Sequence, residues 1–321
     1  MLIPRFWSRA ESQAVTPDGK SVRFHVWRGS RTSTAEAQTL ADEAVARVAE
    51  RIRRGEGFPE RYTYGDRPLR EEVVREFPAS AGAEPPDAAI TRNSYGALVL
   101  NAARAFFIDV DVPRDEAPPA PSPAASPAAS LWGVLDSLPL PGALRSIADT
   151  FRPPAGSGAG VGGSSGPADP AAAALDRLRR WVDSHPGWRV RVYRTYAGLR
   201  YLVTHAPFSP ADAEAQATMR ALGTDPQYIR LCQVQKSFRA RLTPKPWRIG
   251  MPNPPVRFPF ESPADEREMR DWESRYALAS QNRATCNFIE ELGRGTEHPD
   301  IAPLRELHDE QTRAISGLPL A

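Results

Sequence analysis

The order of apolar patterns along the chain predicts an α+β fold with a β-α-β-β-α-β core. Between residues 104 and 243, an apolar strand is followed by a helical stripe, two alternating strands, a second helix and a final mixed segment. Alternation with period two indicates strands, and apolar residues at three- and four-residue spacing indicate helices. This order is typical of a ferredoxin-like or RRM-like sheet, in which the first and third strands are central neighbours.

An N-terminal αβ module is expected before this core. Residues 21–27 alternate as in a half-buried strand. Ser33 and Glu36 have the spacing of a capping box, which predicts that a helix begins there. A shorter helix is expected around 69–77, and two strands joined by a polar turn are expected over 89–100.

A low-complexity insertion interrupts the core. Residues 113–172 are rich in Pro, Gly, Ala and Ser, and they enclose one apolar segment, 131–151, that would form a short amphipathic helix. We therefore expect four parts. Residues 1–112 form the N-terminal module with the first core strand, and 113–172 the insertion. Residues 173–250 complete the core, and 251–321 form a C-terminal helical region.

The composition indicates a folded protein without a membrane span. Hydrophobic residues make up 41% of the 321 residues and charged residues 25%, which is ordinary for a globular chain. There is no run of about 18 apolar residues, and the N-terminus lacks the apolar segment of a secretory signal. Cys232 and Cys286 form no Cys-x-x-Cys pair, so we expect neither a disulfide framework nor a zinc site, and a cytoplasmic location.

Two carboxylates close the first core strand. Asp109 and Asp111 lie two residues apart in an apolar run, so strand alternation puts both on one face. Two acids that emerge together are costly unless a cation or a basic group lies between them. Mg²⁺ or Mn²⁺ would supply that charge, and so would arginines of neighbouring strands. The sequence leaves both alternatives open.

Basic residues are segregated in the second half of the core. The stretches 184–211 and 226–260 contain arginines and lysines but no acid. Such segregation indicates a surface for phosphates, although pairing with the acidic helices elsewhere in the chain explains it equally well. The residues expected to bind phosphate are Arg194, Thr195, Arg200, His205, Arg239, Arg241, Lys245 and Arg248.

The segment Asp109-Val110-Asp111 resembles the Asp-x-Asp motif in the catalytic core of archaeo-eukaryotic-type primases and primase-polymerases. That family has an RRM-like palm and a second motif, on a later hairpin, whose histidine contacts nucleotide phosphate. In this chain Arg200 stands at the place of that histidine, and His205 is only a distant substitute. Asp225 is the candidate for the family's third acid, although its neighbours match poorly. Three other segments, at residues 93–96, 194–200 and 238–248, resemble an uncharacterised bacterial family, which implies no function.

The resemblance implies metal-dependent nucleotidyl transfer on nucleic acid. Asp109, Asp111 and Asp225 would be catalytic, and the first two would bind Mg²⁺ or Mn²⁺. Nucleic acid and nucleotides would be the partners. The alternative is a non-catalytic single-stranded nucleic-acid-binding protein of RRM-like fold that uses the same basic hairpin. Aromatic residues expected to stack on bases are Tyr193, Tyr196 and Trp247.

Overall fold

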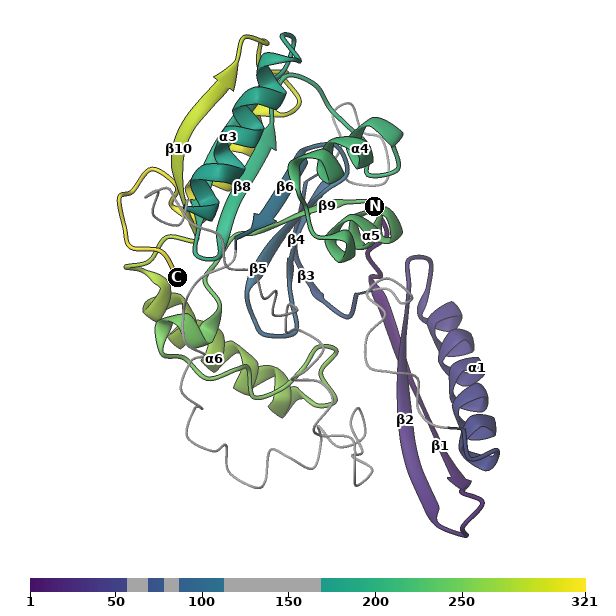
Figure 1. The fold of residues 1–321 in the computed structure, drawn as a ribbon. Coiled ribbons are helices and arrows are strands. Elements are labelled where there is room, and N and C mark those ends of the chain that lie inside the picture. The colour runs from purple at the N-terminus through teal and green to yellow at the C-terminus, as the bar shows by residue number, and fades with distance from the viewer. Residues whose placement is uncertain (57–68, 78–86, 113–168) are drawn as a thin grey trace, which may run out of the picture. The chain divides into compact units, whose positions relative to one another are not determined.

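The computed structural model describes residues 1–56, 69–77, 87–112 and 169–321 (Figure 1). Within these residues the chain is a mixed α+β protein with antiparallel sheets and six α-helices. The expected insertion with its amphipathic helix lies, up to residue 168, outside the described residues.

The N-terminal residues form a hairpin with one helix. Strands β1 (Phe6–Val15) and β2 (Ser21–Ser30) pair antiparallel, and α1 (Thr34–Arg53) packs against both. The expected cap is present, because the Ser33 hydroxyl accepts a hydrogen bond from the Glu36 N–H at 3.1 Å. This module has a small core of its own, made by Ala10, Ala14, Phe24, Ala41, Val45, Ala49 and Ile52.

A four-stranded antiparallel sheet follows, with the order β3-β4-β5-β9. Its strands are β3 (Glu72–Phe77), β4 (Ala88–Arg92), β5 (Leu98–Ala102) and β9 (Phe238–Arg241). The helix expected over 69–77 is wrong. That stretch is an edge strand, and its pairing with β4 outweighs the local helical pattern.

The second four-stranded sheet has the order β10-β7-β8-β6 and is also antiparallel. Its strands are β10 (Cys286–Gly293), β7 (Arg189–Thr195), β8 (Gly198–Val203) and β6 (Phe106–Asp111). As expected, the first core strand, β6, is the neighbour of the third, β8. The last expected core strand, β9, pairs with β5 in the other sheet instead of with β6. Strand β10 lies in a region expected to be helical.

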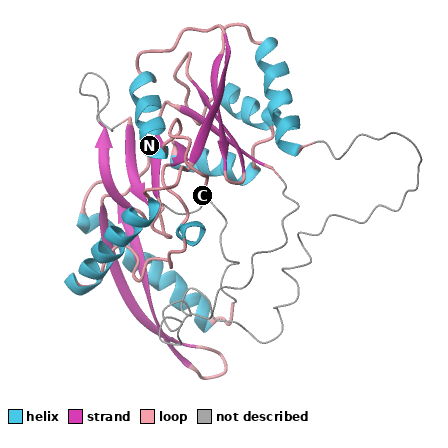
Figure 2. Cartoon of the chain, turned by 90° about the vertical axis from the view of Figure 1, so that its left-hand side faces the viewer, coloured by secondary structure: helices cyan, strands magenta, loops and turns pink. Residues whose placement is uncertain are grey.

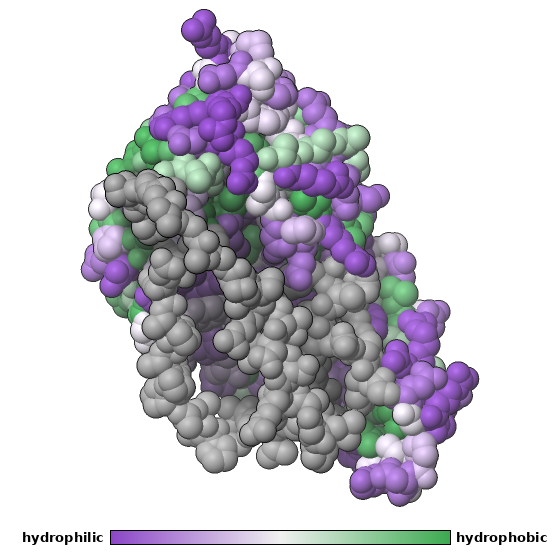
Figure 3. Space-filling model, in the orientation of Figure 1, coloured by the Kyte–Doolittle hydropathy of each residue, from purple (hydrophilic) through white to green (hydrophobic). Residues whose placement is uncertain are grey.

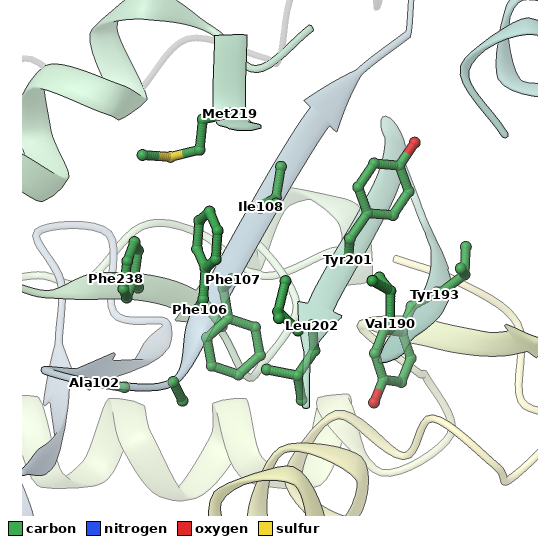
Figure 4. Close-up of a cluster of buried hydrophobic side chains, with 14 of the residues drawn as sticks. Ala102, Phe106, Phe107, Ile108, Val190, Tyr193, Tyr201, Leu202, Met219 and Phe238 are labelled. Atoms are coloured by element: carbon green, nitrogen blue, oxygen red, sulfur yellow. The ribbon is translucent and has the colours of Figure 1, made fainter. Parts of the chain in front are cut away.

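Helices cover this second sheet. In Figure 2 the strands, in magenta, run between helices, in cyan. Helix α3 (Pro170–Asp183) connects β6 to β7, while α4 (Ala213–Leu222) and α5 (Pro226–Gln235) lie between β8 and β9 in the chain. The main core lies between these elements, and Figure 4 shows Ile108 and Tyr201 side by side in it.

The C-terminal part contains α6 (Pro263–Ser280) and α7 (Ala302–Thr312). Helix α7 lies against the face of the second sheet that carries Phe107, whose ring centroid is 5.1 Å from that of His308. No helix in the described part of the chain is long and apolar enough to cross a membrane. Hydrophilic residues, in purple, are spread over much of the face seen in Figure 3.

Candidate functional site

The strand register brings the first aspartate of the pair next to an arginine. Asp109 on β6 lies opposite Arg200 on β8, which in turn lies opposite Tyr193 on β7. Residues that are directly opposite in a sheet share a face, so all three side chains leave the sheet on the side that α7 covers. The close approach of β6 to the start of β8 requires Gly198, because a Cβ there would be 2.0 Å from the Val110 carbonyl oxygen.

Asp109 and Arg200 form a bidentate salt bridge. Arg200 Nε donates to Asp109 Oδ1 at 2.7 Å, and Nη2 donates to Oδ2 at 2.8 Å. The Arg200 side chain is only 2% exposed, whereas that of Asp109 is 34% exposed. Burial opposes the charge on Arg200, but the adjacent carboxylate outweighs it and raises the pKa of the guanidinium. Both carboxylate oxygens of Asp109 are therefore occupied.

A second ion pair extends this arrangement under α7. Asp309 accepts hydrogen bonds from the Tyr193 hydroxyl at 2.6 Å and from Arg191 Nη2 at 2.7 Å. His308 Nε2 lies 3.4 Å from Arg200 Nη1, and burial lowers the pKa of this histidine to about 4. His308 is therefore neutral at pH 7. We call these residues, together with Asp109, the closed network, because each charge in it has an opposite charge beside it.

Asp111, at the end of β6, has a different environment. Its side chain is exposed, and no described residue forms a hydrogen bond or an ion pair with it. Loss of hydration at the strand end and the negative charges of Asp109 and Asp225 raise the pKa of Asp111. Asp225 caps α5, where its side chain accepts a hydrogen bond from the Gln227 N–H at 2.9 Å.

Two of the three expected acids already accept hydrogen bonds within the protein. Arg200 takes both oxygens of Asp109, and one oxygen of Asp225 caps a helix. Among the residues that the structure describes, no three His, Cys, Asp or Glu side chains are grouped to hold a metal ion. Of the three, only Asp111 accepts no hydrogen bond from a described residue.

A group of cations lies near Asp111. Arg241 ends β9, and Lys245 and Arg248 belong to the turn and the 3₁₀-helix η2 (Pro246–Ile249) that follow. We call these three residues the cation cluster. Burial and the positive charges of Arg241 and Arg248 lower the pKa of Lys245, and the charge of Asp111 raises it only in part.

Two members of the cation cluster have no carboxylate partner in the described residues. Arg241 Nη1 is buried without a hydrogen-bond partner there, and burial lowers the pKa of this guanidinium. No described residue forms an ion pair or a hydrogen bond with the Lys245 ammonium. Asp111 is close enough to act electrostatically on both cations, yet it lies beyond ion-pair distance. The site therefore holds charge that a ligand can neutralise.

Aromatic rings surround the cation cluster. The Arg248 guanidinium lies 3.8 Å from the ring centroid of Tyr196, and the Lys245 ammonium lies 5.3 Å from that of Trp247. Tyr95, from the turn between β4 and β5, meets Trp247 at 5.4 Å with an interplanar angle of 65°. Together with the end of β6, which carries Asp111, four segments of the chain thus meet at this site.

Two residues expected to bind phosphate are used elsewhere. Arg239 donates to Glu71 at 2.8 Å inside the first sheet. His205 lies beyond the opposite end of β8 from Asp111, where its ring is 4.7 Å from that of Trp188. Its Nδ1 accepts a hydrogen bond from the Arg189 N–H at 3.3 Å.

Three further residues that were expected to contact a ligand lie on β7: Tyr193, Arg194 and Thr195. The Thr195 hydroxyl accepts a hydrogen bond from the Gly198 N–H at 3.0 Å and so supports the turn. Arg194 follows Tyr193 in the strand, so alternation points it to the face opposite Asp109. Tyr193 itself is fully buried and cannot stack on a base. No local pattern identified His308 or Asp309, because their role depends on packing against a sheet more than 100 residues earlier.

Comparisons with known proteins assign neither a family nor a function to the chain, so the site is interpreted from its geometry. A scan against protein-family models found no match, and neither did searches of curated proteins and of solved structures. The arrangement can bind anions at the cation cluster. At Asp109 the Arg200 guanidinium is already bound to both carboxylate oxygens.

Proposed function

We propose that this protein binds the phosphate groups of single-stranded nucleic acid, without catalysis, at the cation cluster. One observation carries the proposal: Arg241 and Lys245 have no carboxylate partner in the described residues, while the neighbouring Asp109 is paired with Arg200 through both of its oxygens. An arginine offers phosphate a bidentate donor, and a lysine adds a point charge. Burial and the charges of Arg241 and Arg248 lower the pKa of Lys245, and an anion at this position would offset both effects.

An RRM-like core remains part of this proposal. The position of β8 between β6 and β7, with α3 as the connection, is what such a core requires. The pairing of β9 with β5 departs from it. That departure carries β9 away from its usual place beside the first core strand, and the residues that follow β9 are those of the cation cluster.

The proposal is tested by fluorescence anisotropy with a labelled single-stranded oligonucleotide. We expect Lys245→Gln to weaken binding about 5- to 10-fold, because one phosphate contact is lost. The matched control is Lys20→Gln, since Lys20 is exposed in the hairpin turn and already pairs with Asp18 at 2.7 Å. Equal affinities of the two variants would contradict a phosphate site at Lys245.

A second candidate is metal-dependent nucleotidyl transfer. It is favoured by the exposed carboxylate of Asp111, on which Asp109 and Asp225 both act electrostatically. Mg²⁺ or Mn²⁺ bound there with substrate phosphates would supply Lewis-acid stabilisation. In this function Asp109 would either share its carboxylate between Arg200 and the ion or be released by Arg200.

Calorimetric titration with Mn²⁺ separates the two candidates. Heat of binding in the wild-type protein that is lost in Asp111→Asn, and kept in a control at the exposed Asp271, would support nucleotidyl transfer. The same absence of heat in wild type and Asp111→Asn would remove this candidate and leave the binding function.

A further inference from the structure

Trp247 is a large aromatic residue that the fold leaves exposed. Its relative exposure is 51%, although it lies in η2 next to buried Pro246. Tryptophan side chains are highly buried on average, and an exposed one beside cations is typical of a binding surface. The Lys245 ammonium lies over this ring at 5.3 Å, so the ring and the cation cluster are parts of one surface.

Trp247 is held by a rigid neighbour. Tyr95 contacts it in a T-shaped arrangement, and the turn that carries Tyr95 is held by Asn93, whose side-chain oxygen accepts hydrogen bonds from the Tyr95 N–H at 3.2 Å and the Ala97 N–H at 3.1 Å. Gly96 in this turn has φ +88°. These constraints set the position of Tyr95 before any ligand arrives.

The turn also has no room to move toward the body of the protein. A Cβ atom at Gly96 would lie 2.3 Å from the ring of Trp272, which is itself fully buried and donates to the Pro252 carbonyl at 3.1 Å. The aromatic pair, Tyr95 and Trp247, is therefore a preorganised surface next to the phosphate site.

We propose that the aromatic pair is a stacking platform for an unpaired nucleobase, with Trp247 as the contacting ring. The inference rests on the proposed function, because the phosphates of the same ligand would lie on Arg241 and Lys245. An aromatic face favours any base that is free to stack, without a requirement for its sequence. The ligand class is then single-stranded nucleic acid, since a duplex keeps its bases stacked inside and a bare polyphosphate has none.

The test compares three labelled or competing ligands of equal length: a single strand, an abasic strand with the same phosphates, and a duplex. The variants are Trp247→Leu, Trp247→Phe and the control Phe6→Leu, an exposed aromatic of the N-terminal hairpin. We expect Trp247→Leu to weaken binding of the single strand about 10-fold, Trp247→Phe to weaken it less, and Phe6→Leu to have no effect. Binding of the abasic strand should be the same in all four proteins and weaker than that of the normal strand.

Two outcomes would overturn the stacking platform and leave the phosphate site standing. One is equal loss of affinity for normal and abasic strands in Trp247→Leu, because the ring would then act only by supporting Lys245. The other is wild-type affinity of Trp247→Leu for the normal strand. Failure of the wild-type protein to bind either strand would instead contradict the proposed function, and the platform with it.

Discussion

The closed network and the cation cluster are two charged regions near β6. The charges of the first are paired with opposite charges within the protein, and two cations of the second are not. In the closed network Arg200 meets Asp109 and Arg191 meets Asp309, each within 2.8 Å. In the cation cluster Arg241 and Lys245 have no carboxylate partner in the described residues. The paired charges of the closed network hold parts of the fold together. The unpaired charges of the cation cluster are those that we propose a ligand neutralises.

One residue connects the two regions. Besides its bond to Asp109, Arg200 donates through Nη1 to the backbone carbonyl of Arg241 at 2.9 Å. The closed network therefore positions the end of β9, from which the cation cluster begins. Buried ion pairs are weak evidence for net stability, but removal of one partner is costly. Replacement of either Asp109 or Arg200 should therefore destabilise the protein.

The largest effect is expected when Asp109 is replaced. Asp109→Leu leaves the guanidinium of Arg200 charged, 2% exposed and without its carboxylate. We expect the free energy of unfolding in urea to fall by about 3–5 kcal/mol, the usual cost of an uncompensated buried charge. Arg200→Met should cost less, because the 34% exposed Asp109 can be partly hydrated.

The double variant Asp109→Leu, Arg200→Met completes the cycle. We expect it to be less destabilised than the sum of the two single variants, since neither charge remains unpaired. Additive losses would show that the two side chains do not stabilise each other, and Asp109 would then be available for another role.

The next effect concerns the pH dependence of stability. The pKa of His308 falls from 6.5 to about 4 on folding, mainly through burial, with Arg200 and Asp309 as charged neighbours. Between these values the unfolded chain binds a proton that the folded chain does not, so stability decreases as the pH falls through this window. The loss is about 3 kcal/mol when complete near pH 4.

Unfolding in urea from pH 7 to pH 4 measures this loss. His308→Gln should be less stable at pH 7 but should lack most of the further decrease. His298→Gln, outside the closed network, is the control and should keep the wild-type profile. The same pH profile in all three proteins would contradict a buried neutral His308.

The sequence predicted the strand of Asp109 and Asp111 and its neighbour β8, because alternation and element order are local signals. It did not reveal which residue neutralises Asp109. The pairing of Asp109 with Arg200 depends on α7. This helix covers the sheet with His308 and Asp309, and Arg200 is therefore buried beside Asp109 instead of exposed to solvent. The sequence also did not reveal that Arg239 pairs with Glu71, which lies 168 positions away.

The position of β9 was beyond local signals too. Residues 238–241 alternate in the same way whether they pair with β6 or with β5, so only the extra strands of the N-terminal half decide between the two. Trp247 was predicted to stack from its basic neighbours, but its contact with Tyr95 was not predicted, since the two residues are 152 positions apart.

A smaller effect should appear in the pH dependence of nucleic-acid binding. Burial and the charges of Arg241 and Arg248 lower the pKa of Lys245 below its ordinary value of 10.5. Affinity for a single strand should therefore decline as the pH rises toward this lowered value, before an ordinary lysine loses its proton. Lys245→Arg should keep its affinity over the same range in anisotropy titrations. An identical decline in the arginine variant would show that Lys245 is not the titrating group.

The most direct test of a phosphate site at the cation cluster is the salt dependence of single-strand binding. Each phosphate contact contributes about −0.7 to the slope of log Kobs against log salt. With three cations in the cluster we expect a slope of about −2 for the wild-type protein and for Lys20→Gln, and about −1.4 for Lys245→Gln. Equal slopes in the three proteins, or no binding by the wild type at low salt, would contradict the assignment of the cation cluster as the phosphate site.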